Sequence, residues 1–127
     1  MRNLFKKDNK APLYKSFYHA FCGILSCLKE ERNMFIHFSI MCLVIIFGFI
    51  FNIKLSEWIV CIILFSLVMA LELVNTAIET TIDICSPQIN PKAKIAKDTA
   101  AGAVLLTAIA SAIIGLIIFI PKIMTIF

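Results

Sequence analysis

Two long stretches without Lys, Arg, Asp or Glu dominate this sequence: residues 33–53, which number 21, and residues 99–121, which number 23. A helix of about 20 apolar residues crosses the roughly 30 Å hydrocarbon layer of a bilayer. Of all 127 residues, 61% are hydrophobic and 16% are charged, whereas a soluble domain has about half apolar and about a quarter charged residues. The chain is therefore predicted to be an integral membrane protein, and a soluble or disordered chain is excluded.

A third span is predicted between these two, although it carries acidic residues. Residues 58–71 form an uncharged stretch of only 14, so the segment spans a bilayer only if the helix continues further. At 1.5 Å per residue, Glu72 then lies roughly 21 Å and Glu79 roughly 32 Å from Trp58, which places both carboxylates near one edge of the bilayer. The expected spans of the single membrane domain, residues 1–127, are about 33–53, 58–82 and 98–120.

Apolar residues also recur with helical spacing ahead of the first span. The separations are 4, 4, 3 and 4 residues, for Leu13, Phe17, Phe21, Ile24 and Leu28. This is the stripe of an amphipathic helix. Because lysines lie near both ends, residues 13–30 are predicted to form a helix in the membrane interface. A signal peptide is the alternative, but no small-residue cleavage site follows the apolar stretch before Lys29.

Basic residues are distributed unevenly around the predicted spans. Seven basic residues precede the first span: Arg2, Lys6, Lys7, Lys10, Lys15, Lys29 and Arg32. The turn between the first and second spans has one, the loop between the second and third spans has three, and the C-terminal end has one. Cytoplasmic loops carry an excess of Lys and Arg, so the N-terminus is expected in the cytoplasm and the C-terminus outside. The net charge of +4 is expected to serve contact with anionic lipid at the cytoplasmic face, and no nucleic-acid partner is expected.

The connection between the second and third spans is the longest loop expected. Residues 85–97 contain Pro87 and Pro91, and prolines mark turns and loops. Only this stretch is predicted to be long enough to act as a lid or to bind a ligand.

One face of the second predicted span is polar. Within about 60° of one another on a helix lie Glu72, Thr76, Glu79 and Asp83, with Asn75 at their border. An ionised carboxylate within a bilayer costs several kcal/mol unless it is paired, hydrated or neutralised, so acids in a span indicate function. A hydrogen-bonded seam between helices is the structural alternative.

Polar groups from the other two spans are expected at the same depth. Glu31 precedes the first span, and Lys97 and Asp98 begin the third. Carboxylates at a water-accessible boundary suit Mg²⁺, a lysine suits phosphate oxygens, and a further carboxylate can take a proton from a hydroxyl. These are the parts of phosphoryl transfer. Spacing alone also leaves open an ion or proton pathway.

Several motifs together resemble the prokaryotic diacylglycerol kinase family. ALELVNTAIE at 70–79, then Asp83, then AKDTAAGAV at 96–104 match the family signature ExxNxAxE…D…AKDxAAxAV. The likeness includes SFYHAFCGI at 16–24 and the acidic Glu31, and it covers nearly the whole chain. Residues 111–122 resemble the Gram-positive branch, which is associated with undecaprenol as acceptor, whereas the enterobacterial branch prefers diacylglycerol.

This resemblance implies a fold and an activity. The fold is an all-α membrane protein, a homotrimeric bundle of protomers that each have three transmembrane helices and an N-terminal surface helix. The activity is that of a multi-pass cell-membrane lipid kinase, which uses ATP with Mg²⁺ as cofactor to phosphorylate a membrane lipid alcohol. Undecaprenol is the expected acceptor and diacylglycerol the alternative. An ion- or proton-conducting oligomer is the alternative from another class of protein.

The resemblance also implies the roles of individual residues. Glu72 is implied to be the catalytic base and to contact the lipid substrate together with Asn75. Glu31 and Glu79 are implied to hold Mg²⁺. Nucleotide contacts are implied for Asn75, Lys94, Lys97, Asp98 and, where the better-known branch has a tyrosine, His19.

Overall fold

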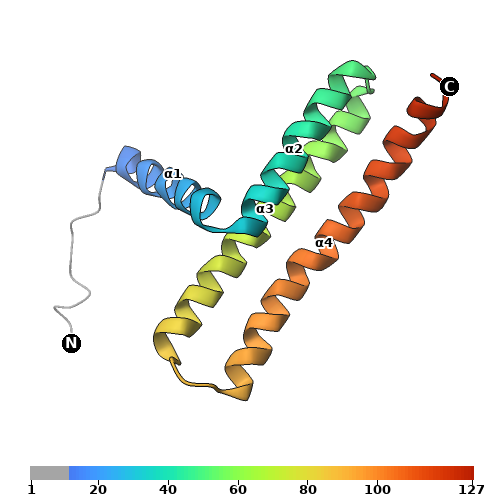
Figure 1. The fold of residues 1–127 in the computed structure, drawn as a ribbon. Coiled ribbons are helices and arrows are strands. Elements are labelled where there is room, and N and C mark those ends of the chain that lie inside the picture. Colours follow the sequence, from blue (N-terminus) through green and yellow to red (C-terminus); the bar gives the residue numbers. More distant parts are fainter. Residues whose placement is uncertain (1–11) are drawn as a thin grey trace.

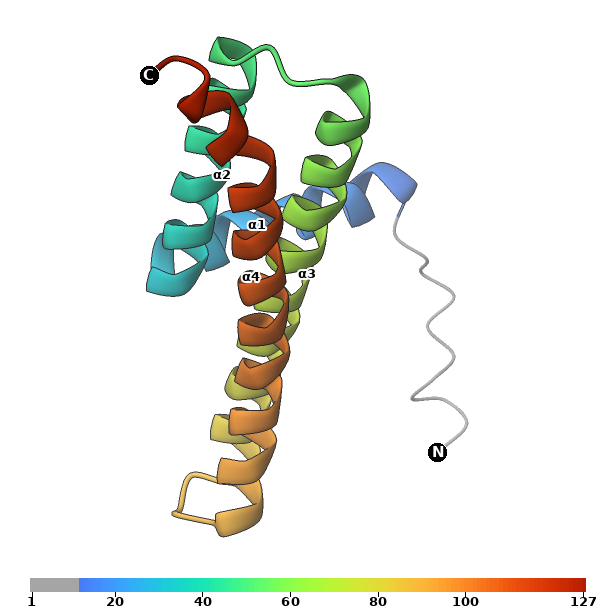
Figure 2. The same cartoon turned by 90° about the vertical axis from the view of Figure 1, so that its right-hand side faces the viewer.

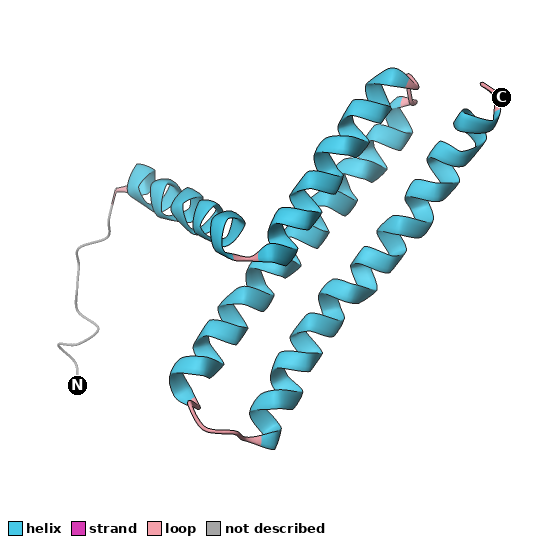
Figure 3. Ribbon diagram, in the orientation of Figure 1, coloured by secondary structure: helices cyan, strands magenta, loops and turns pink. Residues whose placement is uncertain are grey.

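The computed structural model describes residues 12–127, which fold into helices joined by short connections (Figure 1). The helices are α1 (Leu13–Glu30), α2 (Arg32–Ile50), α3 (Leu55–Cys85) and α4 (Pro91–Met124). No strand occurs in this part of the chain (Figure 3). Helices α2, α3 and α4 are each long and apolar enough to cross a membrane. The predicted all-helical fold with three spans is therefore confirmed.

Helix α3 is central to the arrangement. It packs along α4 as a long hairpin and also against α2, while α1 leaves the bundle at a steep angle and contacts α2 and α3 (Figures 1 and 2). No Cα atom of α2 lies within 8 Å of a Cα atom of α4. The backbones of α2 and α4 are therefore further apart than those of α2 and α3 or of α3 and α4, although Val44 of α2 and Ile118 of α4 belong to the same packed cluster near the α2–α3 turn.

The three spans differ in length. At 1.5 Å per residue, the 19 residues of α2 extend about 28 Å, whereas the 31 of α3 and 34 of α4 extend about 46 and 51 Å. The hydrocarbon layer is roughly 30 Å thick. Because α2 starts beside the middle of α3, the α3–α4 hairpin projects beyond the start of α2 (Figure 1).

A sharp elbow joins α1 to α2 at one residue. Glu31 has extended backbone angles, φ −100° and ψ 117°, and its N–H donates to the Cys27 carbonyl at 2.9 Å. Cys27 and Met34 on either side are buried. The Cys27 thiol donates to the Thr76 hydroxyl of α3 at 3.4 Å. The elbow is thus fixed against the point where α3 begins to project.

The α3–α4 loop is shorter than the sequence predicts. It comprises residues 86–90 and not 85–97, because α4 already begins at Pro91. Proline suits the first position of a helix, where its missing N–H would have no partner. The Asn90 side chain caps the helix by accepting the Lys92 N–H at 2.9 Å. The predicted extent of the loop is therefore wrong, since only residues 86–90 connect the two helices.

The opposite end of the bundle is closed by packing and one ion pair. Ile53, Cys61 and Ile118 form a buried cluster beneath the α2–α3 turn. The Glu57 carboxylate accepts the Lys54 N–H at 3.0 Å and the Lys122 ammonium at 2.9 Å. These contacts fix the start of α3 and the end of α4 relative to the turn between α2 and α3.

Gly48→Ala is expected to destabilise the protein at this turn. An added Cβ would lie 2.6 and 2.8 Å from Trp58 ring atoms and 3.2 Å from Ile53. Because the Trp58 ring also packs against Phe49, we expect the free energy of unfolding to fall by about 1–3 kcal/mol. The measurement is the Tm in detergent micelles. Gly102→Ala is the matched control, since its Cβ meets nothing within 4 Å, and equal Tm values for both variants would contradict the prediction.

Candidate functional site

The polar stripe of α3 lies on its buried face. The buried residues of this helix are Cys61, Val68, Glu72 and Asn75, which helical spacing places on one side. Glu72 is 1% exposed and Asn75 is 5% exposed. The Asn75 side-chain amide donates to a Glu79 carboxylate oxygen at 3.3 Å. The structure therefore brings Glu72, Asn75 and Glu79 together on one face.

Two buried oxygen atoms of this stripe have no hydrogen-bond partner within residues 12–127. They are Glu72 Oε2 and Asn75 Oδ1. Leaving a buried polar group unpaired costs about 1–3 kcal/mol, and more for a charged one. A structural seam would pair these atoms with another helix of the bundle. Two unpaired acceptors one turn apart are instead typical of a site whose donors come from a ligand.

Glu31 approaches this stripe from the elbow between α1 and α2. It lines a hollow of about 510 Å³ between α1 and α3, together with Gly23, Thr76 and Thr80. Thr76 and Thr80 follow Asn75 and Glu79 directly in the sequence, so Glu31 lies at the level of the polar stripe along α3. Carboxylates from two parts of the chain thus converge at the depth where α3 emerges from the bundle.

The carboxylates do not form a ready-made metal cage. Within residues 12–127, no group of three or more His, Cys, Asp or Glu side chains is close enough to hold a metal ion. Mg²⁺ does not need one, because it usually takes one or two protein carboxylates and keeps phosphate oxygens and waters as its other ligands. The donors present fit an ion that arrives with a phosphate.

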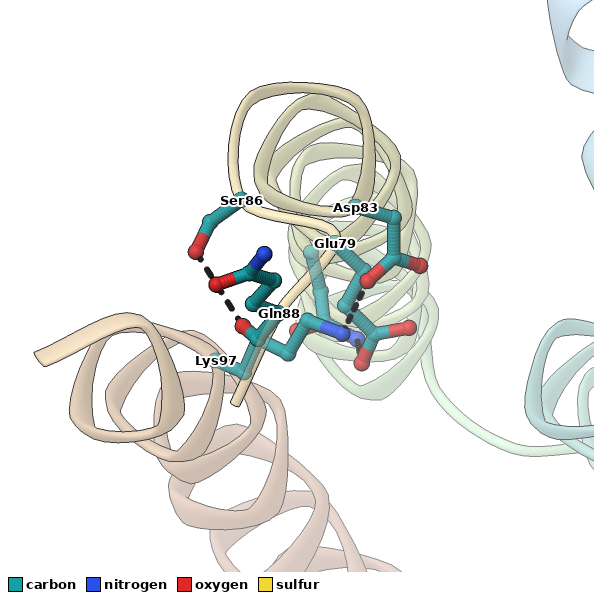
Figure 4. Close-up of polar contacts among 6 residues, drawn as sticks. Glu79, Asp83, Ser86, Gln88 and Lys97 are labelled. Atoms are coloured by element: carbon teal, nitrogen blue, oxygen red, sulfur yellow. Dashed lines mark hydrogen bonds and ion pairs between the residues drawn. The ribbon is translucent and has the colours of Figure 1, made fainter. Parts of the chain in front are cut away.

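An ion pair joins the projecting parts of α3 and α4. The Lys97 ammonium contacts the Asp83 carboxylate, and Glu79 lies one turn along α3 beside them (Figure 4). The Lys97 side chain is 36% exposed and that of Asp83 is 64% exposed. Exposed pairs contribute about 0–1 kcal/mol. Lys97 can therefore exchange its carboxylate partner for a phosphate at little cost.

The other predicted nucleotide contacts lie further out. Lys94 and Asp98 pair with each other along α4 at 2.7 Å, and both are exposed. His19 is exposed on α1, where its ring packs edge to face on Tyr18, and the start of α1 lies away from α3 (Figure 1). The structure thus groups Glu31, Glu72, Asn75 and Glu79 but brings none of these three residues to them.

Sequence reasoning missed residues that shape the hollow beside Glu31. Gly23 and Thr80 line it, and Cys27 anchors the elbow to Thr76. A signal was present for two of them. Gly23 is the one glycine of the amphipathic segment, and Thr80 follows Thr76 by one helical turn. No pattern indicated Cys27, because its partner lies 49 residues away.

The fold and the site together define a small helical protein with three helices that could span a membrane and a carboxylate site where α3 emerges from the bundle. The family described as prokaryotic diacylglycerol kinase matches residues 18–119. Undecaprenol kinase from Bacillus subtilis (strain 168) is 44% identical over 119 residues, which cover 91% of this chain and 97% of that protein. Diacylglycerol kinase from a Synechocystis species is 38% identical over 114 residues, 89% of this chain and 65% of that protein.

The chain belongs to the prokaryotic diacylglycerol kinase family. It is thus a multi-pass membrane lipid kinase, with a lipid as phosphate acceptor and ATP as phosphate donor. This membership confirms the resemblance and the predicted enzyme class. It also favours the kinase over the ion- or proton-conducting oligomer that residue spacing had left open.

Proposed function

We propose that this chain transfers the γ-phosphate of ATP to the hydroxyl of undecaprenol and forms undecaprenyl phosphate. Two findings support this acceptor: the 44% identity to an undecaprenol kinase, and the fact that the alignment covers 97% of that protein. The observation that carries the chemistry is the buried Glu72 carboxylate, whose Oε2 atom has no partner within the described chain. That atom is free to accept a hydroxyl proton.

Glu72 is the proposed general base. A lipid hydroxyl that donates to Glu72 Oε2 gains nucleophilicity as its proton moves to the carboxylate. Asn75 supports this arrangement, because its amide group is held by Glu79 at 3.3 Å and its own Oδ1 stays available as an acceptor. Both residues are buried, so water is excluded from the point of attack. We assign the contact with the lipid hydroxyl to this pair.

Glu31 and Glu79 are the proposed Mg²⁺ ligands. Glu31 lies in the elbow between α1 and α2, and Glu79 lies two helical turns beyond Glu72 on α3. Hard carboxylate oxygens are the donors that Mg²⁺ prefers. When bound, the ion neutralises negative charge on the phosphates of ATP. The two side chains position that charge beside Glu72 and outside the apolar part of the bundle.

The nucleotide is proposed to lie along the projecting α3–α4 hairpin. Lys97 is the proposed phosphate contact, since its ion pair with Asp83 is exposed and exchangeable. Lys94, Asp98 and Asn75 are proposed as further contacts on the same side. His19 is proposed at the adenine end, which requires a second protomer or a movement of α1, because α1 starts away from α3 (Figure 1).

We further propose a homotrimer with a cytoplasmic N-terminus and an outward C-terminus. Within one chain the proposed nucleotide contacts His19, Lys94 and Asp98 pair only with residues of their own helices, which supports a site that is completed by a neighbouring protomer. Small residues let helices approach closely, and four of them follow one another in α4 beyond Lys97 and Asp98: Ala100, Ala101, Gly102 and Ala103. Lys15, Lys29 and Arg32 are the described basic residues proposed to contact anionic lipid, and those ahead of residue 12 lie outside the described chain.

Phosphate transfer to two acceptors tests the proposed function. Purified protein receives radiolabelled ATP and Mg²⁺, with undecaprenol and a diacylglycerol in separate mixed micelles at equal mole fraction. We expect kcat/KM for undecaprenol to exceed that for diacylglycerol by at least about tenfold, a difference of about 1.4 kcal/mol in transition-state binding. The reverse order would retain the kinase and replace the acceptor. Transfer to neither, by folded protein, would contradict the proposal.

A further inference from the structure

A second hollow lies between the three spans, on the side of Glu72 that faces the α2–α3 turn. Its volume is about 230 Å³, and it is lined from all three helices. The part of α3 that faces it consists of Cys61, Leu64, Phe65, Val68 and Met69. We call this hollow the interspan cleft. It exists because α2 and α4 stay apart, with no pair of their Cα atoms within 8 Å.

The interspan cleft continues the face of α3 that carries the site. Its α3 residues have the spacing i, i+3, i+4, i+7 and i+8, and Glu72 follows as i+11 on the same side. Val68 is one helical turn from Glu72, and the distance along α3 from Cys61 to Glu72 is about 16 Å. One helix face therefore presents a carboxylate at one end and an apolar trough at the other.

The lining of the cleft suits a hydrocarbon chain. Its side chains are apolar except for His37 and Ser111, and the Ser111 hydroxyl already donates to the Thr107 carbonyl at 2.7 Å. The width on the α4 side comes from small residues, Ala108, Ala112 and Gly115. Small residues in a span normally let a neighbouring helix approach, yet α2 does not approach here. The space is left for a narrow apolar occupant.

We propose that the interspan cleft binds the first isoprene units of a long-chain prenyl alcohol whose hydroxyl lies at Glu72. This inference rests on the proposed function and adds the place of the lipid tail. The hydroxyl of the prenyl alcohol lies at the Glu72 carboxylate, so its apolar tail must extend from there toward the bilayer interior. The trough along α3 leads in that direction, away from the projecting hairpin that we assign to the nucleotide.

The cleft would act through shape and not through hydrophobic burial. A prenyl tail in the bilayer is already surrounded by hydrocarbon, so moving it into the cleft gains little from leaving water. What it gains is close van der Waals contact with three helices at once. Filling the cleft should therefore weaken lipid binding by a moderate factor and leave the use of ATP unchanged.

Two substitutions that fill the cleft test this inference. Ala112→Phe and Gly115→Leu place a larger side chain in it, and a Cβ at Gly115 meets nothing within 4 Å, so the backbone is not strained. We expect each to raise KM for undecaprenol about fivefold, with kcat and KM for ATP nearly unchanged. Ala110→Phe is the matched control, because Ala110 is exposed on the same helix outside the cleft and should keep the wild-type KM.

A prenol with a photoreactive diazirine on its third isoprene unit locates the tail independently of turnover. We expect cross-links at Met41 or Met69, which line the cleft from α2 and α3, and their loss in Ala112→Phe. Cross-links elsewhere, or an unchanged KM in both filling variants while the wild type phosphorylates undecaprenol, would overturn the cleft and leave the proposed function standing. If the probe cross-links to the cleft but the enzyme transfers no phosphate to undecaprenol, the tail site is retained and the proposal that undecaprenol is the acceptor is contradicted.

The oligomeric state of the same variants separates the tail from a second copy of the chain. We expect Ala112→Phe and Ala110→Phe to elute like the wild type in size-exclusion chromatography with the same Tm. If Ala112→Phe alone dissociates the oligomer, another protomer occupies the cleft and the inference is wrong.

Discussion

Glu72→Gln is expected to lower the rate of lipid phosphorylation by about 10²–10⁴-fold, the usual contribution of a general base. The substitution keeps the size and shape of the side chain but removes its ability to take the hydroxyl proton. Glu72 is 1% exposed and one of its carboxylate oxygens has no partner within residues 12–127. The measurement is kcat for transfer of radiolabelled phosphate to undecaprenol.

Stability distinguishes this loss from misfolding. A buried carboxylate without a cationic partner is destabilising, so the amide should fold at least as well as the acid. We therefore expect the Tm of Glu72→Gln to equal or exceed that of the wild type while activity falls. Glu57→Gln is the control on the same helix, since Glu57 pairs with Lys122 at the far end and should retain the wild-type kcat. A stable Glu72→Gln enzyme with full activity would refute the assignment of the base.

Glu31→Gln and Glu79→Gln are expected to raise the Mg²⁺ concentration needed for half-maximal rate by about tenfold or more each. Each substitution replaces an anionic oxygen ligand by a weaker neutral one. Glu79 accepts a hydrogen bond from Asn75, which shares a buried face with Glu72, and Glu31 lines the hollow beside this stretch of α3. The measurement is the initial rate as a function of Mg²⁺ concentration at fixed ATP.

A double variant tests whether the two carboxylates share one ion. If they do, the loss in kcat/KM for Glu31→Gln with Glu79→Gln will be smaller than the product of the single losses, because either change already removes the shared site. Fully multiplicative losses would indicate separate roles. A Mg²⁺ dependence equal to that of wild type in both single variants would exclude them as ligands, and Glu57→Gln again provides the control.

The spans and the polar stripe were accessible to sequence reasoning because they depend on local periodicity. Uncharged runs of 21 and 23 residues define two spans, and the spacing of Glu72, Asn75 and Glu79 fixes their common face on any helix. The roles assigned to those residues remain predictions, since they come from family resemblance. Periodicity could not show that this face is buried, whereas in the structure Glu72 is 1% exposed and Asn75 is 5% exposed.

Features set by contacts between distant residues were not accessible. The loop at 86–90 is shorter than the predicted 85–97, because Pro91 begins α4 and proline marks the start of a helix as well as a loop. The approach of Glu31 to the stripe depends on the elbow and on the contact between Cys27 and Thr76, which are 49 residues apart. Local sequence periodicity does not predict a contact between residues so far apart in the chain.

The projecting α3–α4 hairpin has a kinetic consequence. Because α3 and α4 outlast α2 by roughly 18–23 Å, a water-soluble phosphate donor and a lipid acceptor can meet while each stays in its own phase. The relevant acceptor concentration is then its mole fraction in the membrane surface, and the donor concentration is that of the bulk solution. Diluting the acceptor with inert detergent at constant molarity should therefore slow turnover, in the manner of an interfacial reaction.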